Sequence, residues 1–224
     1  MMSNLFSIFD PCTSENFSMN WLSMLYFMMF LPTLFWFSPS KYLIFMNNLL
    51  KFIIKEMKIS LDKNLNFYNL LMFKSLFIFI MLNNFISLFP YIFNSTSHMV
   101  VSLCLSINLW ISYMLFGWIK NSFYMFIHLT PQGTPYILMP FMVMIESVSN
   151  LIRPLTLAIR LSANIIAGHL LMTLISQSSN NLGLILIIFM ILIQSLLVVL
   201  EVAVSFIQAY VFSILSSLYS SETN

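Results

Sequence analysis

Arg160 is the residue with the clearest chemical potential, because the stretch that follows it, Leu161 to Leu200, contains no Lys, Arg, Asp or Glu. The nearest charged residues before it are Arg153 and Glu146. A guanidinium stays protonated at every physiological pH, and in hydrocarbon it costs roughly 2.5 to 3.5 kcal/mol on insertion scales. An arginine in such surroundings indicates a functional site in which a fixed positive charge acts on an ion.

Groups that can carry protons occur in the same apolar half of the chain. Arginine cannot relay protons, whereas a carboxylate in a low-dielectric medium can be loaded and unloaded near neutral pH. We therefore expect Glu146 and Glu201 to be transfer residues and His169 to be a third titratable group. The alternative for each glutamate is an inert ion pair, and for His169 it is one hydrogen bond to a neighbouring helix. The polar neighbours are Asn164, Ser205 and Gln208.

Small side chains surround the arginine on a helical wheel. Ala163, Asn164 and Ala167 lie within about 60° of Arg160, and His169 points almost directly away. Small residues allow another helix to approach closely, so this face predicts either static helix packing or a contact with a second polar surface. The permanent charge at its centre favours the second.

Composition places the chain among integral membrane proteins. Of its 224 residues, 60% are hydrophobic and only 7% are charged, against about 25% in soluble domains. The sequence contains no Gly-rich phosphate loop, paired-cysteine metal spacing, zinc motif or nucleophile elbow, and Cys12 lies far from Cys104. We therefore expect no cofactor, metal or nucleic-acid partner, and any coupled reaction would take place on a different subunit.

Hydropathy predicts an all-α membrane protein built from three upright spans, one surface helix and a long hairpin. The spans are residues 18–37, 70–89 and 99–119, each about long enough to cross a hydrocarbon core of about 30 Å. Residues 41–64 carry lysines on one face and apolar residues on the other, which predicts an amphipathic helix on the membrane surface. The alternative is a solvated loop with helical bias.

The last third of the chain predicts the hairpin, from residues 136–176 and 184–218. Helices of this length exceed the bilayer core and must be steeply tilted or broken. Polar residues recur every seven positions, which places one polar stripe on each helix and favours the tilted form. The stripes are Glu146, Arg153 and Arg160 on the first helix, and Gln194, Glu201 and Gln208 on the second.

Lysine positions predict the orientation of the chain. Lys41 to Lys74 and Lys120 fall on one side of the membrane in this arrangement. The positive-inside rule assigns that side to the cytoplasm, or to the matrix of a mitochondrion, and places the N-terminus opposite.

The segment Leu155 to His169, with Arg160, Asn164 and Gly168 inside it, resembles subunit a of the proton-translocating ATP synthases in its mitochondrial form. Three further stretches agree in order: Pro131 to Pro135, Glu146 to Asn150, and Glu201 to Tyr210. The resemblance extends over the whole chain and is strongest from about residue 130 onward.

The resemblance implies a non-catalytic proton-channel subunit of the mitochondrial inner membrane, and the lysine positions then predict that its N-terminus lies in the intermembrane space. Arg160 would face the carboxylates of a rotating ring of c subunits, near Asn164 and Gln208. Glu201 and His169 would belong to the half-channel from the intermembrane space, and Glu146 to the half-channel to the matrix. The other implied partners are stator and membrane subunits and inner-membrane lipids. Arg153 departs from the family pattern, and we interpret it as a partner of Glu146 or an interfacial anchor.

Two other functions fit a polytopic membrane protein. A secondary transporter would show related halves with interrupted helices, and the sequence has no such repeat. A non-transporting scaffold would leave the ionisable stripes on both long helices without a role.

Overall fold

The computed structural model describes residues 5–14, 17–31, 37–61, 67–130, 133, 135–179 and 183–223. Within these ranges the regular elements are all helical, which confirms the all-α class. The short elements are the 3-10 helices η1 (Leu5–Phe9), η2 (Met19–Leu25) and η3 (Ser95–Ser97), with the α-helices α1 (Phe27–Phe30) and α5 (Ser122–Leu129). The long helices are α2 (Lys41–Ser60), α3 (Phe67–Ser87), α4 (Met99–Lys120), α6 (Met139–Ser178) and α7 (Leu184–Thr223).

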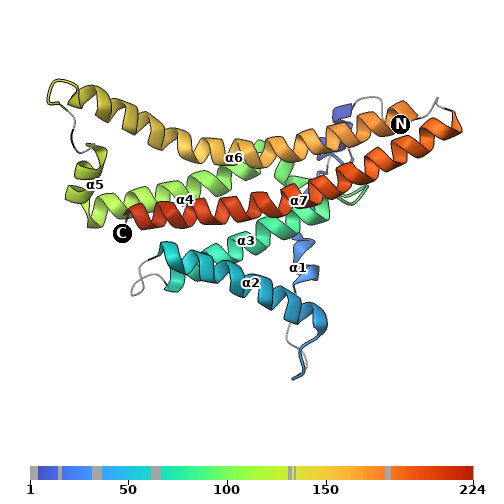
Figure 1. Cartoon of the computed structure of the whole chain (residues 1–224), viewed down its shortest axis with the longest axis horizontal. Coiled ribbons are helices and arrows are strands. Elements are labelled where there is room, and N and C mark those ends of the chain that lie inside the picture. Colours follow the sequence, from blue (N-terminus) through green and yellow to red (C-terminus); the bar gives the residue numbers. More distant parts are fainter. Residues whose placement is uncertain are drawn as a thin grey trace.

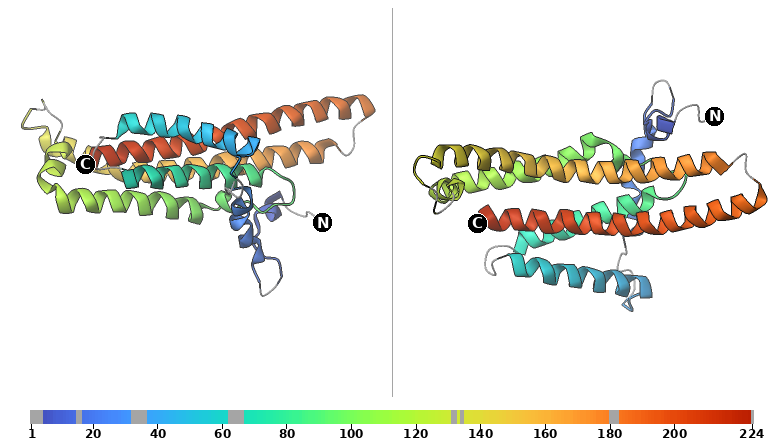
Figure 2. Two further views of the ribbon diagram at one scale, coloured as in Figure 1. Left: turned by 90° about the horizontal axis from the view of Figure 1, so that it is seen from below. Right: turned by 45° about the horizontal axis from the view of Figure 1, so that its top comes forward.

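The α6–α7 hairpin sets the length of the molecule. The two helices run antiparallel and side by side, and their connected ends extend past the other helices (Figures 1 and 2). Each has 40 residues and is therefore roughly 60 Å long, about twice the thickness of a hydrocarbon core. The predicted hairpin is confirmed. α6 is bowed (Figure 1) and contains Pro154, whose missing N–H leaves one helical hydrogen bond unmade.

Four helices in the described part of the chain are long and apolar enough to cross a membrane. They are Asn69–Ser87, Met99–Lys120, Met139–Ser178 and Ile185–Glu222. The first two correspond to the predicted spans 70–89 and 99–119, and they pack against the hairpin, α3 mainly on α7 and α4 mainly on α6.

The buried face of α7 is lined by small residues. Ser213, Ser216, Ser217 and Ser220 are between 0% and 3% exposed, and each hydroxyl donates to a backbone carbonyl in its own helix. Because each hydroxyl already donates a hydrogen bond within its own helix, α7 can bury these polar residues at little cost. Small side chains let helices approach closely in a membrane protein, and this face therefore allows α3 and α4 to pack tightly on α7.

Helix α2 has the amphipathic pattern that the sequence predicts. Leu43, Met46, Ile53 and Met57 are at most 7% exposed, and the helix packs on α3 and α7. Its last turn is joined to α7 by a hydrogen bond between the Ser60 and Ser217 hydroxyls, 3.1 Å apart. The apolar face thus contacts protein rather than lipid. Residues 62–64 of the predicted surface helix lie outside the described residues.

The predicted single span at residues 18–37 is not one continuous α-helix where the structure describes it, and residues 32–36 lie outside the described residues. The described part of this stretch forms η2, a turn and the four-residue α1, and it ends at Leu31 in an extended conformation (φ −70°, ψ 120°). Pro32 follows, and the residue before a proline is forced away from the helical region. Polar side chains also bond outside the segment, since the Ser23 hydroxyl donates to the Phe93 carbonyl at 2.9 Å.

A tight connection between α3 and α4 brings polar groups inside the bundle. The Asn94 side chain caps η3 by accepting from the Thr96 N–H at 3.2 Å, and all three residues of η3 are buried. Helix α5 after α4 is a further element that the sequence analysis did not predict.

Candidate functional site

Arg160 lies on a face of α6 that no other described helix covers. On the other side of the helix, Ala158, Leu161 and Ser162 are at most 2% exposed. Arg160 itself is exposed, and its guanidinium forms no hydrogen bond or ion pair with any residue that the structure describes. The fixed charge therefore has no counter-ion among the described residues.

The predicted neighbours share this face with Arg160. Ala163, Asn164 and Ala167 are all exposed, so the helical-wheel placement agrees with the structure. The Asn164 amide donates to the Gln208 side-chain oxygen on α7 at 3.2 Å, and Gln208 is 6% exposed. The hairpin thus brings two predicted site residues together, 44 residues apart in sequence.

Glu201 packs directly against the backbone of α6 at Gly168. A Cβ atom added to Gly168 would lie 2.5 Å from Glu201 Oε1, closer than real Cβ contacts allow. Only glycine leaves room for the carboxylate at this place. Both carboxylate oxygens are buried, and neither has a hydrogen-bond partner among the described residues.

Glu201 lines a partly open cavity with about 350 Å³ of empty space, which includes the space at its mouth. His169 also lines it, and its Nε2 atom is buried and lacks a partner among the described residues. The Phe9 and His169 rings are nearly perpendicular, with centroids 6.5 Å apart. Buried polar groups without protein partners are places where ordered water is expected. This arrangement can hold a short hydrogen-bonded chain of water that ends at Glu201.

Asn84 is a cavity residue that the sequence analysis missed. Its Oδ1 atom accepts from the Thr96 hydroxyl at 3.0 Å, and its Nδ2 atom is buried without a partner in the described part of the chain. Asn83 and Asn84 are adjacent amides in an otherwise apolar span, and this pair could have indicated a polar site inside the bundle. Asn84, Ser87 and Ser205 line the cavity from α3 and α7.

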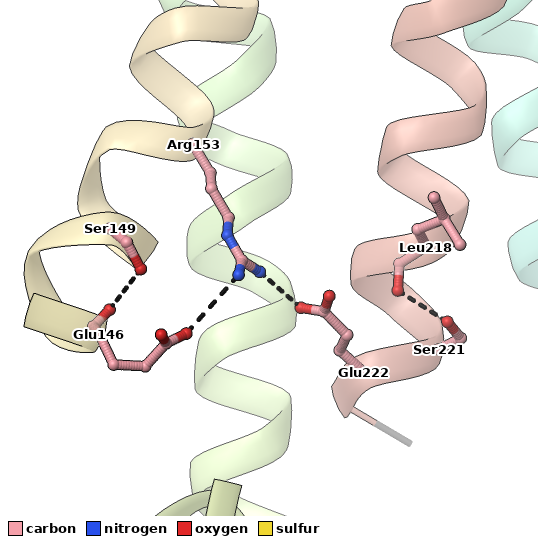
Figure 3. A network of polar contacts seen from close by, with 6 residues as sticks. All are labelled: Glu146, Ser149, Arg153, Leu218, Ser221 and Glu222. Atoms are coloured by element: carbon pink, nitrogen blue, oxygen red, sulfur yellow. Dashed lines mark hydrogen bonds and ion pairs between the residues drawn. The ribbon is translucent and has the colours of Figure 1, made fainter. Parts of the chain in front are cut away.

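Glu146 lies in a separate polar cluster toward the other end of the hairpin (Figure 3). Its carboxylate is 3.6 Å from Arg153 Nη2, and Arg153 Nη1 donates to Glu222 Oε2 at 2.8 Å. The sequence left two interpretations of Arg153, a partner of Glu146 or an interfacial anchor, and the structure supports the first. Glu222 is a second partner that was missed, because it lies beyond the predicted helix end at residue 218.

The two clusters lie on opposite sides of Arg160 along the hairpin. The antiparallel register pairs Gly168 with Glu201, Asn164 with Gln208, and Arg153 with Glu222. Carboxylates can take up and release protons on either side, and a guanidinium between them can only repel cations or attract anions. The structure therefore has two separate carboxylate clusters with a fixed positive charge between them.

Known proteins are similar to this chain over its full length. The model of the family "ATP synthase A chain" matches residues 17–221. The protein named ATP synthase subunit a from Drosophila melanogaster is 52% identical over 224 residues, and that from Aedes aegypti is 54% identical over 226 residues. Both alignments cover 100% of this chain and of the relative. This multi-pass membrane protein belongs to the ATP synthase subunit a family.

Proposed function

We propose that the chain is the proton-channel stator subunit of a mitochondrial ATP synthase, which carries protons to and from carboxylates on a rotating ring of c subunits. The observation that carries the proposal is the position of Arg160, an exposed guanidinium on an apolar helix with no counter-ion among the described residues. An arginine in hydrocarbon is too costly to be left unpaired, so its partner is sought on another protein.

A ring carboxylate is a suitable partner for physical reasons. In contact with lipid such a group must be neutral, because an isolated ionised carboxylate is strongly disfavoured in a low-dielectric medium. Next to Arg160 it can ionise, since the guanidinium compensates its charge. Ala163 and Ala167 leave space for the ring helices to pass close to α6.

Glu201 and His169 form the first of two offset half-channels in this proposal, open to the intermembrane space. Support comes from the cavity around Glu201 and from the unpaired polar atoms of both side chains, which water can solvate. Asn164 and Gln208 connect this cavity to the face that carries Arg160. A proton would pass from water to Glu201 and then to the ring.

Glu146 forms the second half-channel, open to the matrix. It belongs to the cluster near the C-terminal end of α7, where α4 ends at Lys120 (Figure 1). The last turn of α2, with Lys58, reaches the same end of the molecule through the bond of Ser60 to Ser217. The positive-inside rule assigns this end to the matrix, and the N-terminus is proposed on the side of the intermembrane space.

Because the positive charge of Arg160 lies between the two clusters, protons cannot pass directly from one to the other. Net flow then requires that a ring carboxylate carry each proton through the lipid, which couples flow to rotation. The subunit is not itself an enzyme in this proposal, since ATP chemistry takes place on other subunits. The other stator and membrane subunits and inner-membrane lipids are its further partners, and the hairpin is steeply tilted in the bilayer.

The test is Arg160→Ala in the assembled complex. ATP-driven proton pumping should be abolished, while native electrophoresis should show that the complex still assembles. Arg160→Gln keeps a polar side chain without the charge and should behave in the same way. Coupled pumping retained by either variant would contradict the proposal.

A further inference from the structure

Arg153 lies between two carboxylates that come from different helices. Glu146 is two helical turns away on α6, and Glu222 is on α7, so the guanidinium connects the two arms of the hairpin (Figure 3). With both carboxylates ionised, one positive and two negative charges leave the cluster with a net charge of −1. One carboxylate is therefore neutralised only in part.

The geometry decides which carboxylate receives the guanidinium. The distance from Arg153 Nη1 to Glu222 Oε2 is 2.8 Å, which is a charge-assisted hydrogen bond. The distance from Nη2 to Glu146 Oε1 is 3.6 Å, which is too long for a hydrogen bond. Glu222 thus holds the guanidinium, and Glu146 retains the more weakly compensated charge.

No other cation among the residues lining the adjacent cavity can take the place of Arg153. This cavity has about 260 Å³ of empty space, and the lining residues include Tyr113 of α4, Asn150 of α6 and Tyr219 of α7. The Arg153 guanidinium carbon is 5.8 Å from the centroid of the Tyr219 ring. These groups can fix the orientation of the guanidinium, but they add no positive charge.

We propose that Glu222 is a positioning residue, which holds the Arg153 guanidinium and so keeps Glu146 free to exchange protons. A carboxylate that accepts a direct, charge-assisted hydrogen bond is held by its partner, whereas the Glu146 carboxylate, 3.6 Å from the guanidinium, has no such bond to break. The Glu146 side chain is 30% exposed, so the rest of the chain does not enclose it. This inference rests on the proposed function of Glu146 in the second half-channel.

The key variants are Glu222→Gln and the double variant Arg153→Gln with Glu222→Gln, in the complete complex reconstituted in liposomes. In Glu222→Gln the guanidinium loses its hydrogen-bonded carboxylate and moves to Glu146. ATP-driven proton flux should then fall about two- to fivefold, which is the rate change that corresponds to the free energy of a partly exposed ion pair. The double variant removes one charge of each sign, keeps the net charge of −1 and leaves Glu146 free. Its flux should recover to that of the wild type.

A purely structural link between α6 and α7 makes the opposite prediction. It would be broken in both the single and the double variant, and the double variant would be at least as slow as Glu222→Gln. That result, or unchanged flux in Glu222→Gln, would overturn the inference. Ser221→Ala is the matched control, because the Ser221 hydroxyl donates to the Leu218 carbonyl of its own helix and contacts neither carboxylate in Figure 3.

Two further variants keep the test decisive. Glu222→Asp retains the charge on a shorter side chain. If Glu222→Gln does not assemble, Glu222→Asp should slow the flux, and flux equal to that of Ser221→Ala would overturn the inference. Arg160→Ala separates this inference from the proposed function. If Arg160→Ala abolishes ATP-driven proton pumping while the double variant shows no recovery, the positioning role alone fails; if Arg160→Ala retains ATP-driven pumping, the proposed function fails.

Discussion

Replacement of Gly168 by alanine should displace the Glu201 carboxylate while leaving the helix intact. The new Cβ atom would lie 2.5 Å from Glu201 Oε1 and 3.1 Å from its Cγ, whereas ordinary contacts begin at 3.4 Å. The carboxylate must therefore move by about 1 Å, and a displacement of that size can reduce the rate of a positioned step by about 10²-fold. Alanine in a helix interior is more favourable than glycine by about 0.5 to 1 kcal/mol, so α6 itself should not be weakened.

The assay is ATP-driven proton pumping by the reconstituted complex, normalised to the amount of complex on a native gel. We expect Gly168→Ala to pump at least about tenfold more slowly at normal assembly. Gly183→Ala is the matched control, because a Cβ atom there meets nothing within 4 Å. Adding Glu201→Asp to Gly168→Ala shortens the acid by one bond of about 1.5 Å and should restore part of the flux. Full pumping by Gly168→Ala would refute the argument that the position of Glu201 limits proton uptake.

Three other substitutions test the remaining contacts. Glu201→Gln should slow proton flux more than it reduces assembly, and flux equal to that of the wild type would leave Glu201 as a packing residue. Asn84→Leu removes one of the two acceptors of the Thr96 hydroxyl and a polar wall of the cavity, so proton flux should fall, whereas an unchanged rate would show that water reaches Glu201 by another route. Ser213→Leu places a larger side chain at a residue that is 0% exposed, and should lower the free energy of unfolding by about 1 to 3 kcal/mol. Thermal unfolding of the solubilised subunit complex measures the last effect, and an unchanged midpoint would show that α3 and α4 can move away from α7.

Several elements could be predicted because their signal is local. The long hairpin follows from apolar periodicity over residues 136–176 and 184–218. In the structure its helices have slightly different bounds, Met139–Ser178 and Leu184–Thr223. The apolar face of α2 could be predicted for the same reason. The interrupted helix at residues 19–31 could not be predicted, because average hydropathy over residues 18–37 is not affected by a proline at position 32 or by a hydroxyl that bonds to Phe93.

In the candidate site, too, only residues that share a helix face could be grouped from the sequence. The sequence placed Arg160 among Ala163, Asn164 and Ala167, since residues three and four apart share a helix face. Residues missed by the sequence analysis, such as Asn84 and Glu222, reach the site from other helices. Their participation depends on which turns of α3, α6 and α7 lie side by side.

The sequence by itself determined that this is a helical membrane protein of the ATP synthase subunit a family, with a permanent charge on one face of a long apolar helix. Those properties follow from residue type and helical period alone. Only the tertiary structure decided that Glu201 lies against Gly168 and that Arg153 bonds to Glu222, 69 residues away. Such contacts depend on the register between packed helices. The side-chain volumes along the whole interface determine that register together, so no local sequence pattern specifies it.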